Sequence, residues 1–242
     1  MTSFDGVADL YDAARPAYPQ RVYDALEPIA GQVVLEGGTG TGLATRALLD
    51  RGARVVPFDI GAVILRKALA RTAGLAAVVA DGGVLPFRDA CADLVCFAQS
   101  WHWLDPRRRC GESARVLRDA GRWAGWWSHP RADGEVWFDA YWDAVEAACP
   151  TTSRAQRDVD WARGVQESGL FTVGERITVA WVRELSVAVW LAAECSKSYV
   201  ATLAEPERLA LMHELETLVR GRYPSGDIQV PYETWLWIAT KR

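Results

Sequence analysis

Five short apolar runs, separated by stretches of helical periodicity, occupy the first half of the chain. The runs cover residues 32–35, 54–58, 76–80, 93–97 and 121–127. The stretches between them that have helical spacing include residues 43–50, 63–72 and 110–117. A short apolar run without alternation is typical of a strand that is covered on both faces. Because strand and helix alternate in this order, the pattern predicts a parallel α/β sheet with right-handed crossovers.

The regular alternation ends after residue 127. Residues 136–148 have an aromatic-rich helical pattern, and the polar stretch 150–158 follows it. The segment 128–170 therefore interrupts the series of strands. We expect it to be a helical insertion that folds as a lid over the carboxyl edge of the sheet.

Two further strands are predicted at the C-terminal end, over residues 176–183 and 232–240, with helices between them. The last strand alternates at Trp235, Trp237 and Ala239, as suits an antiparallel partner near a sheet edge. The expected fold is a seven-stranded, mostly parallel sheet with an antiparallel last strand and helices on both faces. We predict one domain over 1–242, divided into an N-terminal helical cover, a ligand-binding core, the insertion and a C-terminal part, with the ranges 1–30, 31–127, 128–170 and 171–242.

Composition and charge narrow the possible functions. Half of the 242 residues are apolar, and the net charge is −4 with both signs mixed along the chain. A nucleic-acid partner would demand a basic stripe, and the one basic cluster, residues 107–109, follows a helix-start signal and is expected to be a solvated helix face. No stretch has the apolar length that a bilayer requires, and residues 1–16 do not resemble a signal peptide. We therefore expect a cytoplasmic protein, a monomer or homodimer, without nucleic-acid or membrane partners.

Cysteine and histidine are too few and too scattered for a metal centre. The five cysteines form no CxxC pair, which suggests reduced thiols. The three histidines, His102, His129 and His213, have no metal-ligand spacing. Tryptophan, in contrast, is abundant: there are 12. Several of them lie in segments where a pocket is expected.

The turn after the first predicted strand is rich in glycine and reads Glu36-Gly37-Gly38-Thr39-Gly40-Thr41-Gly42. Glycines at alternating positions let the backbone turn tightly and bring its N–H groups close to a ligand. The spacing is not that of a dinucleotide site, and Leu43 stands where a P-loop requires lysine. The carboxylate of Glu36 would repel a pyrophosphate. It suits a ligand that is cationic or donates hydrogen bonds, such as an amino group.

These residues resemble the first motif of the class I S-adenosylmethionine-dependent methyltransferases, whose fold is Rossmann-like. Asp59, which ends the second apolar run, matches the family's acidic residue that holds both ribose hydroxyls. Asp81, which ends the third run, matches the residue that accepts from the adenine amino group. The segments 85–87, 93–95 and 115–118 are also similar to the family. The resemblance implies that S-adenosylmethionine is the cofactor and S-adenosylhomocysteine the product.

The cofactor-binding residues that the resemblance implies come from the N-terminal cover, the glycine turn and the ends of three strands. They are Tyr11, Arg15, Glu36, Gly37, Gly38, Thr39, Gly40, Gly42, Asp59, Ile60, Asp81, Gly82 and Gln99. Alternative readings exist for several of them. The acidic residues Glu36, Asp59 and Asp81 could each cap the following helix. Gly82 suits a turn better than a direct contact, and Arg15 could either pair with the methionine carboxylate or tether the N-terminal helix.

Other segments resemble the subgroup that includes the trans-aconitate methyltransferases. They are Tyr11-Asp12, residues 15–19, residues 98–103, Leu185-Ser186 and residues 198–200. The chain departs from the family at residues 118–121, where Arg-Asp-Ala-Gly replaces the usual Arg-Pro-Gly-Gly turn. This subgroup implies a carboxylate acceptor, whereas a tryptophan-rich pocket would equally suit an apolar or aromatic molecule.

Candidate residues for the acceptor side follow the fourth and fifth strands. His102 could be a general base, a hydrogen-bond partner of the substrate, or part of an aromatic wall. His129 has the same possible roles with weaker support. The tryptophans that we expect at the substrate are Trp101, Trp103, Trp127 and Trp137.

The sequence thus predicts an enzyme that transfers the methyl group of S-adenosylmethionine to an oxygen or nitrogen of a small molecule, for which a carboxylate is one candidate. The alternatives are a protein of the same fold that uses this cofactor in non-methylating catalysis, and one that binds it for regulation.

Overall fold

The computed structural model describes residues 17–72 and 74–242, which form two compact units. We call the first the sheet unit; it consists of residues 17–128, 160–179 and 234–242. The second, the helical unit, consists of residues 129–159 and 180–233 of the described chain. The predicted insertion 128–170 is thus shared between the two units.

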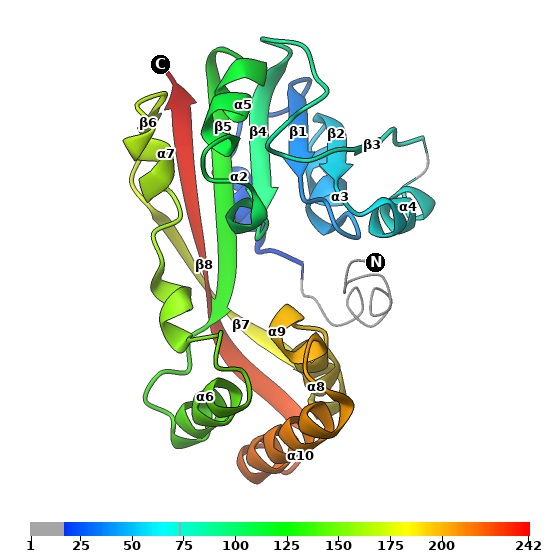
Figure 1. Cartoon of the computed structure of the whole chain (residues 1–242), viewed down its shortest axis with the longest axis vertical. Coiled ribbons are helices and arrows are strands. Elements are labelled where there is room, and N and C mark those ends of the chain that lie inside the picture. Colours follow the sequence, from blue (N-terminus) through cyan, green and yellow to red (C-terminus); the bar gives the residue numbers. More distant parts are fainter. Residues whose placement is uncertain (1–16, 73) are drawn as a thin grey trace. The chain divides into compact units, whose positions relative to one another are not determined.

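One mixed sheet contains all the strands (Figure 1). They are β1 (Val33–Gly37), β2 (Arg54–Asp59), β3 (Val78–Val79), β4 (Ala92–Ala98), β5 (Leu117–Pro130), β6 (Phe171–Val173), β7 (Ile177–Ser186) and β8 (Asp227–Lys241). The order is β3-β2-β1-β4-β5-β8-β6, and β7 pairs with β8. The first five strands pair in parallel, whereas β6 and β8 are antiparallel. The prediction of a mostly parallel sheet with an antiparallel last strand is confirmed.

The unbroken apolar runs are explained by two separate hydrophobic cores in the sheet unit. Along β4, Leu94 and Cys96 belong to one core, whereas Val95 and Phe97 belong to the other. Successive side chains of a strand point to opposite faces, so a strand with a core on each face is apolar at every position. Helices cover the sheet on both faces and contribute side chains to both cores.

Helices of the sheet unit are divided between the two cores. Those that contribute to the core containing Leu94 are α2 (Gln20–Asp24) and α3 (Leu43–Asp50). Those that contribute to the core containing Val95 are α5 (Arg109–Val116) and α7 (Arg163–Glu167). Helix α4 (Ala62–Ala70) follows β2 and buries Ile64, Leu65 and Ala68.

Some element bounds differ from those that the sequence pattern predicts. The fifth strand begins at Leu117 rather than at residue 121. The prediction missed this start because the polar residues Arg118 and Asp119 interrupt the apolar pattern. Among the described residues the sheet has eight strands rather than seven. The strand that was not predicted is β6, which pairs with the C-terminal end of β8. It has three residues, which are too few to show periodicity.

The helical unit has its own hydrophobic core. Its elements are α6 (Val136–Ala148), the 3₁₀ helix η2 (Arg154–Asp158), α8 (Val187–Cys195), α9 (Ser198–Ala201) and α10 (Glu205–Arg222). In α10 the buried residues Leu211, Leu215 and Val219 recur every four positions and face the core. Acidic residues in its first turn and arginines in its last turn complement the helix dipole.

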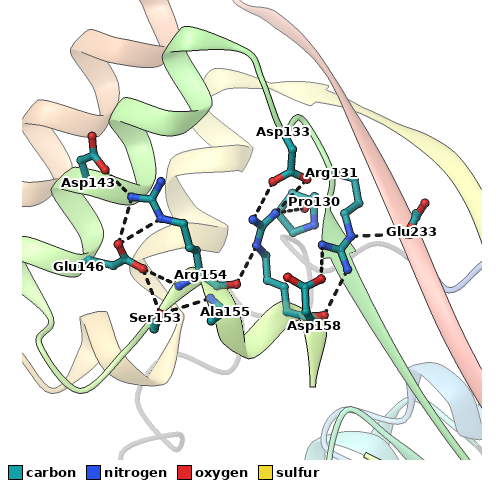
Figure 2. Close-up of polar contacts among 11 residues, drawn as sticks. Pro130, Arg131, Asp133, Asp143, Glu146, Ser153, Arg154, Ala155, Asp158 and Glu233 are labelled. Carbon is teal, nitrogen blue, oxygen red and sulfur yellow. Dashed lines mark hydrogen bonds and ion pairs between the residues drawn. The ribbon is translucent and has the colours of Figure 1, made fainter. Parts of the chain in front are cut away.

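A network of ion pairs fixes η2 within the helical unit (Figure 2). Arg154 pairs with Asp143 and Glu146 of α6, and the backbone N–H of Arg154 donates to the Glu146 carboxylate at 2.6 Å. Arg131 pairs with Asp158 at 2.8 Å and with Glu233 at 3.5 Å. Ion pairs therefore stabilise the polar stretch 150–158, which interrupts the predicted series of helices and strands.

The most buried member of this network is Arg157, whose side chain is 8% exposed. Its guanidinium pairs with Asp133 at 2.7 Å and donates to the carbonyls of Pro130 and Arg154 at 3.0 and 3.1 Å. Phe138 and Trp142 lie against the same guanidinium, with ring centroids at 5.3 and 5.1 Å. All of these contacts would be lost together if the side chain were truncated.

We predict that Arg157→Ala lowers the free energy of unfolding by about 2–4 kcal/mol, because it removes a buried ion pair and the packing around it. Arg163→Ala is the matched control: Arg163 also pairs with a carboxylate, Glu167 at 2.8 Å, but its side chain is 77% exposed. The control should be indistinguishable from wild type. Urea unfolding followed by circular dichroism measures both, and equal losses would contradict the prediction.

Candidate functional site

The glycine turn lies at the carboxyl end of β1, and two kinds of constraint require its glycines. Gly38, Gly40 and Gly42 have φ of 67°, 57° and 83°, a region that strains residues with a Cβ. A Cβ on Gly37 would lie 2.4 Å from Phe97, and one on Gly38 would lie 2.3 Å from Ser100. A Cβ on Gly40 would meet only Ile64, at 4.0 Å. The surface beside Gly40 is therefore open to a ligand.

The carboxylate of Asp59 joins the glycine turn to the start of α4. One oxygen accepts from the backbone N–H of Gly40 at 3.0 Å, and the other accepts from Gly61 at 2.8 Å. Each carboxylate oxygen has a second lone pair, so the group can still accept from a ligand. The next residue, Ile60, is 68% exposed although it is apolar. An exposed aliphatic side chain thus stands beside a hydrogen-bond acceptor.

Asp81 lies two residues after the end of β3, at the start of a turn. Its carboxylate is exposed and accepts from the backbone N–H of Gly83 at 2.8 Å. Val84, which forms a bridge with Asp81, is 57% exposed. A Cβ on Gly82 would lie 2.4 Å from Leu104. Gly82 is thus required for packing in this turn.

The carboxyl group of Glu36 lies beneath the turn rather than at its surface. Glu36 is 1% exposed and accepts a hydrogen bond from the hydroxyl of Thr45, in α3. Burial raises the pKa of this carboxyl to about 8, an effect that the Thr45 hydrogen bond reduces and the charge of Asp59 adds to. The sequence indicated a direct contact between Glu36 and a cationic ligand; the structure places Thr45 against it.

Gln99 and Ser100 connect the end of β4 to the glycine turn. Gln99 has φ of 54°, which is uncommon outside glycine, and its side chain donates to the Tyr18 hydroxyl at 3.4 Å. The Ser100 hydroxyl donates to the carbonyl of Gly37 at 2.6 Å. Spacing alone did not identify Ser100 or Thr45, because each is a small polar residue within an apolar segment.

An aromatic group surrounds His102, which lies in the 3₁₀ helix η1 (Trp101–Trp103) after β4. Its ring centroid is 4.8 Å from that of Trp103 and 5.1 Å from that of Trp161. The indole N–H of Trp127 donates to His102 Nδ1 at 3.2 Å. The sequence did not predict Trp161 at the site, since this residue belongs to an irregular segment that is distant in sequence from β4 and β5.

The four tryptophans predicted for the substrate have different surroundings. Trp103 is 63% exposed, whereas Trp127 is 2% exposed and forms the hydrogen bond to His102. Trp101 is fully buried and packs against Phe97 and Trp123. Trp137 lies in α6 of the helical unit and packs against Trp190. Trp103 is thus the most exposed of the four.

His129 lies in the helical unit, and its Nε2 is buried without a hydrogen-bond partner among the described residues. Burial lowers the pKa of this histidine to about 3, and the charges of Arg131, Arg157 and Lys197 lower it further. A base that holds a proton so weakly is poorly suited to general-base catalysis near neutral pH. Tyr11 and Arg15 lie outside the described residues.

The described part of the chain lacks both a metal-binding cluster and a membrane-spanning helix. No group of at least three His, Cys, Asp or Glu side chains there could hold a metal ion. Nor does that part contain a helix of the length and apolar character that crossing a membrane requires.

Comparison with known proteins identifies the chain's relatives. Residues 35–124 match the family model described as a methyltransferase domain, a span that includes the glycine turn, Asp59, Asp81 and His102. An uncharacterized methyltransferase of Mycobacterium tuberculosis is 31% identical over 240 residues, which cover 96% of this chain and 93% of that protein. The chain belongs to the methyltransferase family. It is an enzyme of the class I group, which implies use of S-adenosylmethionine.

Further relatives of this methyltransferase agree. A malonyl-[acyl-carrier protein] O-methyltransferase of Herminiimonas arsenicoxydans is 36% identical over 126 residues, which cover 50% of this chain and 47% of that protein. The solved structure of a protein assigned as a type II methyltransferase from Anaeromyxobacter dehalogenans has a TM-score of 0.71 at 20% identity, over 94% of this chain and 97% of that chain. The second similarity shows the fold.

We predict that Glu36 makes the stability of this methyltransferase depend on pH. The folded protein keeps a proton that the unfolded chain releases above the ordinary pKa of 4.5. Between about pH 4.5 and 8 the folded state therefore binds more protons, so the free energy of unfolding falls as pH rises. The slope has a ceiling of roughly 1.4 kcal/mol per pH unit.

Glu36→Gln retains a group that can accept from Thr45 but removes the titration. Urea unfolding of both proteins is measured from about pH 5 to 8.5. As pH rises, the free energy of unfolding of the wild type should fall relative to that of Glu36→Gln. A difference that is constant across this range would contradict the prediction.

Proposed function

We propose that this methyltransferase transfers the methyl group of S-adenosylmethionine to an oxygen or nitrogen of a small-molecule acceptor. The observation that carries the proposal is the arrangement at the carboxyl ends of β1 and β2. There the backbone N–H of Gly40, in the open part of the glycine turn, donates a hydrogen bond to the Asp59 carboxylate at 3.0 Å. Ligands of open α/β sheets bind outside the carboxyl ends of the strands.

The described residues are compatible with this cofactor in three respects. The open surface beside Gly40 admits a ligand close to the backbone. Asp59 has lone pairs for two vicinal hydroxyls, and the exposed Ile60 and Val84 offer apolar contacts for a planar base. The exposed carboxylate of Asp81 can accept from an amino group. When bound, the cofactor supplies a methyl group that a positively charged sulfur has already activated.

In this proposal Asp59 holds the ribose, Ile60 packs on the adenine, and Asp81 accepts from the adenine amino group. Gln99 lies at the end of β4 and closes the pocket together with Tyr18. Glu36 acts from beneath the turn, through Thr45. Because the methyl group is already activated, the contribution of the protein is alignment of the acceptor and exclusion of water.

The nature of the acceptor is supported by the aromatic group around His102. Trp103 offers an exposed indole face, which suits an apolar or aromatic molecule. The resemblance to trans-aconitate methyltransferases and the similarity to an O-methyltransferase both favour an oxygen acceptor, including a carboxylate. A carboxylate needs no base, whereas a phenol or an amine has a proton to lose.

The first test is calorimetric titration of the purified protein with S-adenosylhomocysteine, with NADH as the control ligand. We predict micromolar binding that Asp59→Ala weakens by about 10- to 100-fold, because hydrogen bonds to a charged acceptor are lost. Asp119→Ala, an exposed aspartate of β5, is the matched control and should bind as wild type does. Failure of folded wild type to bind would overturn the proposal.

A second test separates backbone strain from cofactor contact at the glycine turn. Gly40 and Gly31 both have positive φ, 57° and 75°, and a Cβ on either finds open space or a single contact at 4.0 Å. Alanine at either position should lower the free energy of unfolding by about 1–2 kcal/mol. We predict that only Gly40→Ala also weakens binding of S-adenosylhomocysteine, by about ten-fold or more.

Thermal unfolding and calorimetry of the two variants give the two quantities separately. If Gly31→Ala weakened binding as much as Gly40→Ala does, the effect would come from strain and the glycine turn would lose its assigned role.

A further inference from the structure

His102 is held in the sheet unit by aromatic rings on several sides. Trp103 and Trp161 lie at tilted angles of 41° and 36° to its ring, and Trp127 lies at 6.3 Å. These rings come from three segments, η1, the end of β5 and the segment before α7. The orientation of the imidazole is therefore fixed by tertiary packing.

The hydrogen bond from Trp127 determines which nitrogen of His102 carries the proton. An indole nitrogen can donate but cannot accept, so a hydrogen bond of 3.2 Å to Nδ1 requires a lone pair on that nitrogen. A neutral imidazole has one N–H and one lone pair. With its lone pair on Nδ1, the neutral His102 ring carries its proton on Nε2.

Trp127 is itself immobilised, so its N–H cannot turn away. Its ring is 2% exposed, stacks on Trp161 at 5.4 Å and 21°, and meets Trp237 edge-on at 5.8 Å. A Cβ on Gly125 would lie 3.1 Å from the Trp127 ring, so glycine at that position leaves room for the indole.

Packing in this chain does not by itself supply a partner to a buried indole. The nitrogens of five other tryptophans are buried without a hydrogen-bond partner among the described residues: Trp101, Trp123, Trp126, Trp142 and Trp161. The bond between Trp127 and His102 is therefore a specific feature of this site.

His102 also lies on the side of the sheet unit where the cofactor is proposed to bind. Ser100, two residues before it, donates to the carbonyl of Gly37 in the glycine turn at 2.6 Å. Trp126, next to Trp127, pairs with Ala98 in the register of β4 and β5. The hydrogen-bonded pair thus lies near the carboxyl end of β4, the strand that pairs with β1 on the side away from β2.

We propose that Trp127 is a positioning residue that fixes His102 as its Nε2–H tautomer, so that His102 meets the acceptor as a hydrogen-bond donor and not as a general base. The inference rests on the proposed function, because it assigns the role of His102 in that reaction. In the reverse tautomer the proton is on Nδ1 and faces the indole N–H of Trp127. That indole donor would be buried without a partner, which disfavours the reverse tautomer by about ten-fold or more.

This state of His102 restricts the acceptor. In the transfer a lone pair of the acceptor oxygen forms the new C–O bond, and the electron pair of the broken C–S bond stays with sulfur. No proton passes to His102, so this arrangement favours an oxygen that arrives already ionised. A carboxylate meets this condition near pH 7, since carboxylic acids have pKa near 4, whereas a phenol with a pKa near 10 does not.

The experiment is a long-range ¹H–¹⁵N correlation spectrum of ¹⁵N-histidine-labelled protein, recorded without cofactor at about pH 8, where an ordinary imidazole is neutral. His102→Gln assigns the His102 signals. We expect them to show a single tautomer with the proton on Nε2. His213, which is exposed on α10, is the internal reference and should show an average of the two tautomers.

Trp127→Phe removes the donor but keeps an aromatic ring, and His102 should then shift toward the averaged pattern while His213 stays unchanged. Trp123→Phe is the matched control, since Trp123 is a buried tryptophan of the same strand whose indole nitrogen has no hydrogen-bond partner within the described part of the chain. It should leave the His102 tautomer as in wild type.

A proton on Nδ1 in the wild type, an averaged wild-type pattern, or an unchanged tautomer in folded Trp127→Phe would overturn the inference. If Trp127→Phe does not fold, the wild-type spectrum alone decides. Because no cofactor is present, the spectrum is independent of the calorimetric test. Loss of S-adenosylhomocysteine binding would count against the proposed function and would not alter the tautomer result.

Discussion

The close approach of the glycine turn to the ends of β2 and β4 is the constraint on which the rest of the site depends. A Cβ on Gly37 would lie 2.6 Å from Phe58 and 2.4 Å from Phe97, and one on Gly38 would overlap Ser100. Because Gly37 and Gly38 have no side chains, the turn packs close to β2 and β4. The backbone of Gly40 then donates to Asp59, and Ser100 donates to the carbonyl of Gly37. Three strand ends thereby converge on one open surface. Asp59 is at once part of the scaffold and a candidate ligand contact, because its remaining lone pairs stay available.

Burial acts on the ionisable groups of this methyltransferase in opposite directions, according to which form carries the charge. It raises the pKa of Glu36, so the buried carboxyl tends to keep its proton. It lowers the pKa of His129, so that ring stays neutral. The guanidinium of Arg157 is surrounded by Asp133, two carbonyl groups and two aromatic rings. Of the residues that the sequence predicts at the site, Glu36 is thus buried within the fold, whereas Asp81 and Trp103 are exposed.

Much of the sheet unit could be predicted because its signals are local. The apolar runs predicted the parallel strands, and the spacing within 43–50 and 136–148 predicted α3 and α6 with the bounds that the structure has. The family motif and the acidic residues at strand ends were also visible, since the carboxyl ends of parallel strands lie along the same edge of a sheet. The start of β5 and the whole of β6 were not predicted. In the first, polar residues mask the strand pattern; the second is held by its pairing with the distant end of β8.

By itself, the sequence determined the α/β class, the mostly parallel sheet and membership of a family that the glycine turn, Asp59 and Asp81 mark. The first two follow from periodicity, which depends on neighbouring residues, and the third follows from the resemblance of short local motifs to a known family. Only the tertiary structure decided that Glu36 lies beneath the turn on Thr45, that Trp101 is core while Trp103 is exposed, and that Trp127 donates to His102. Each of these depends on which side chains from distant segments come into contact. Such contacts are set by the packing of the whole core, which no local pattern records.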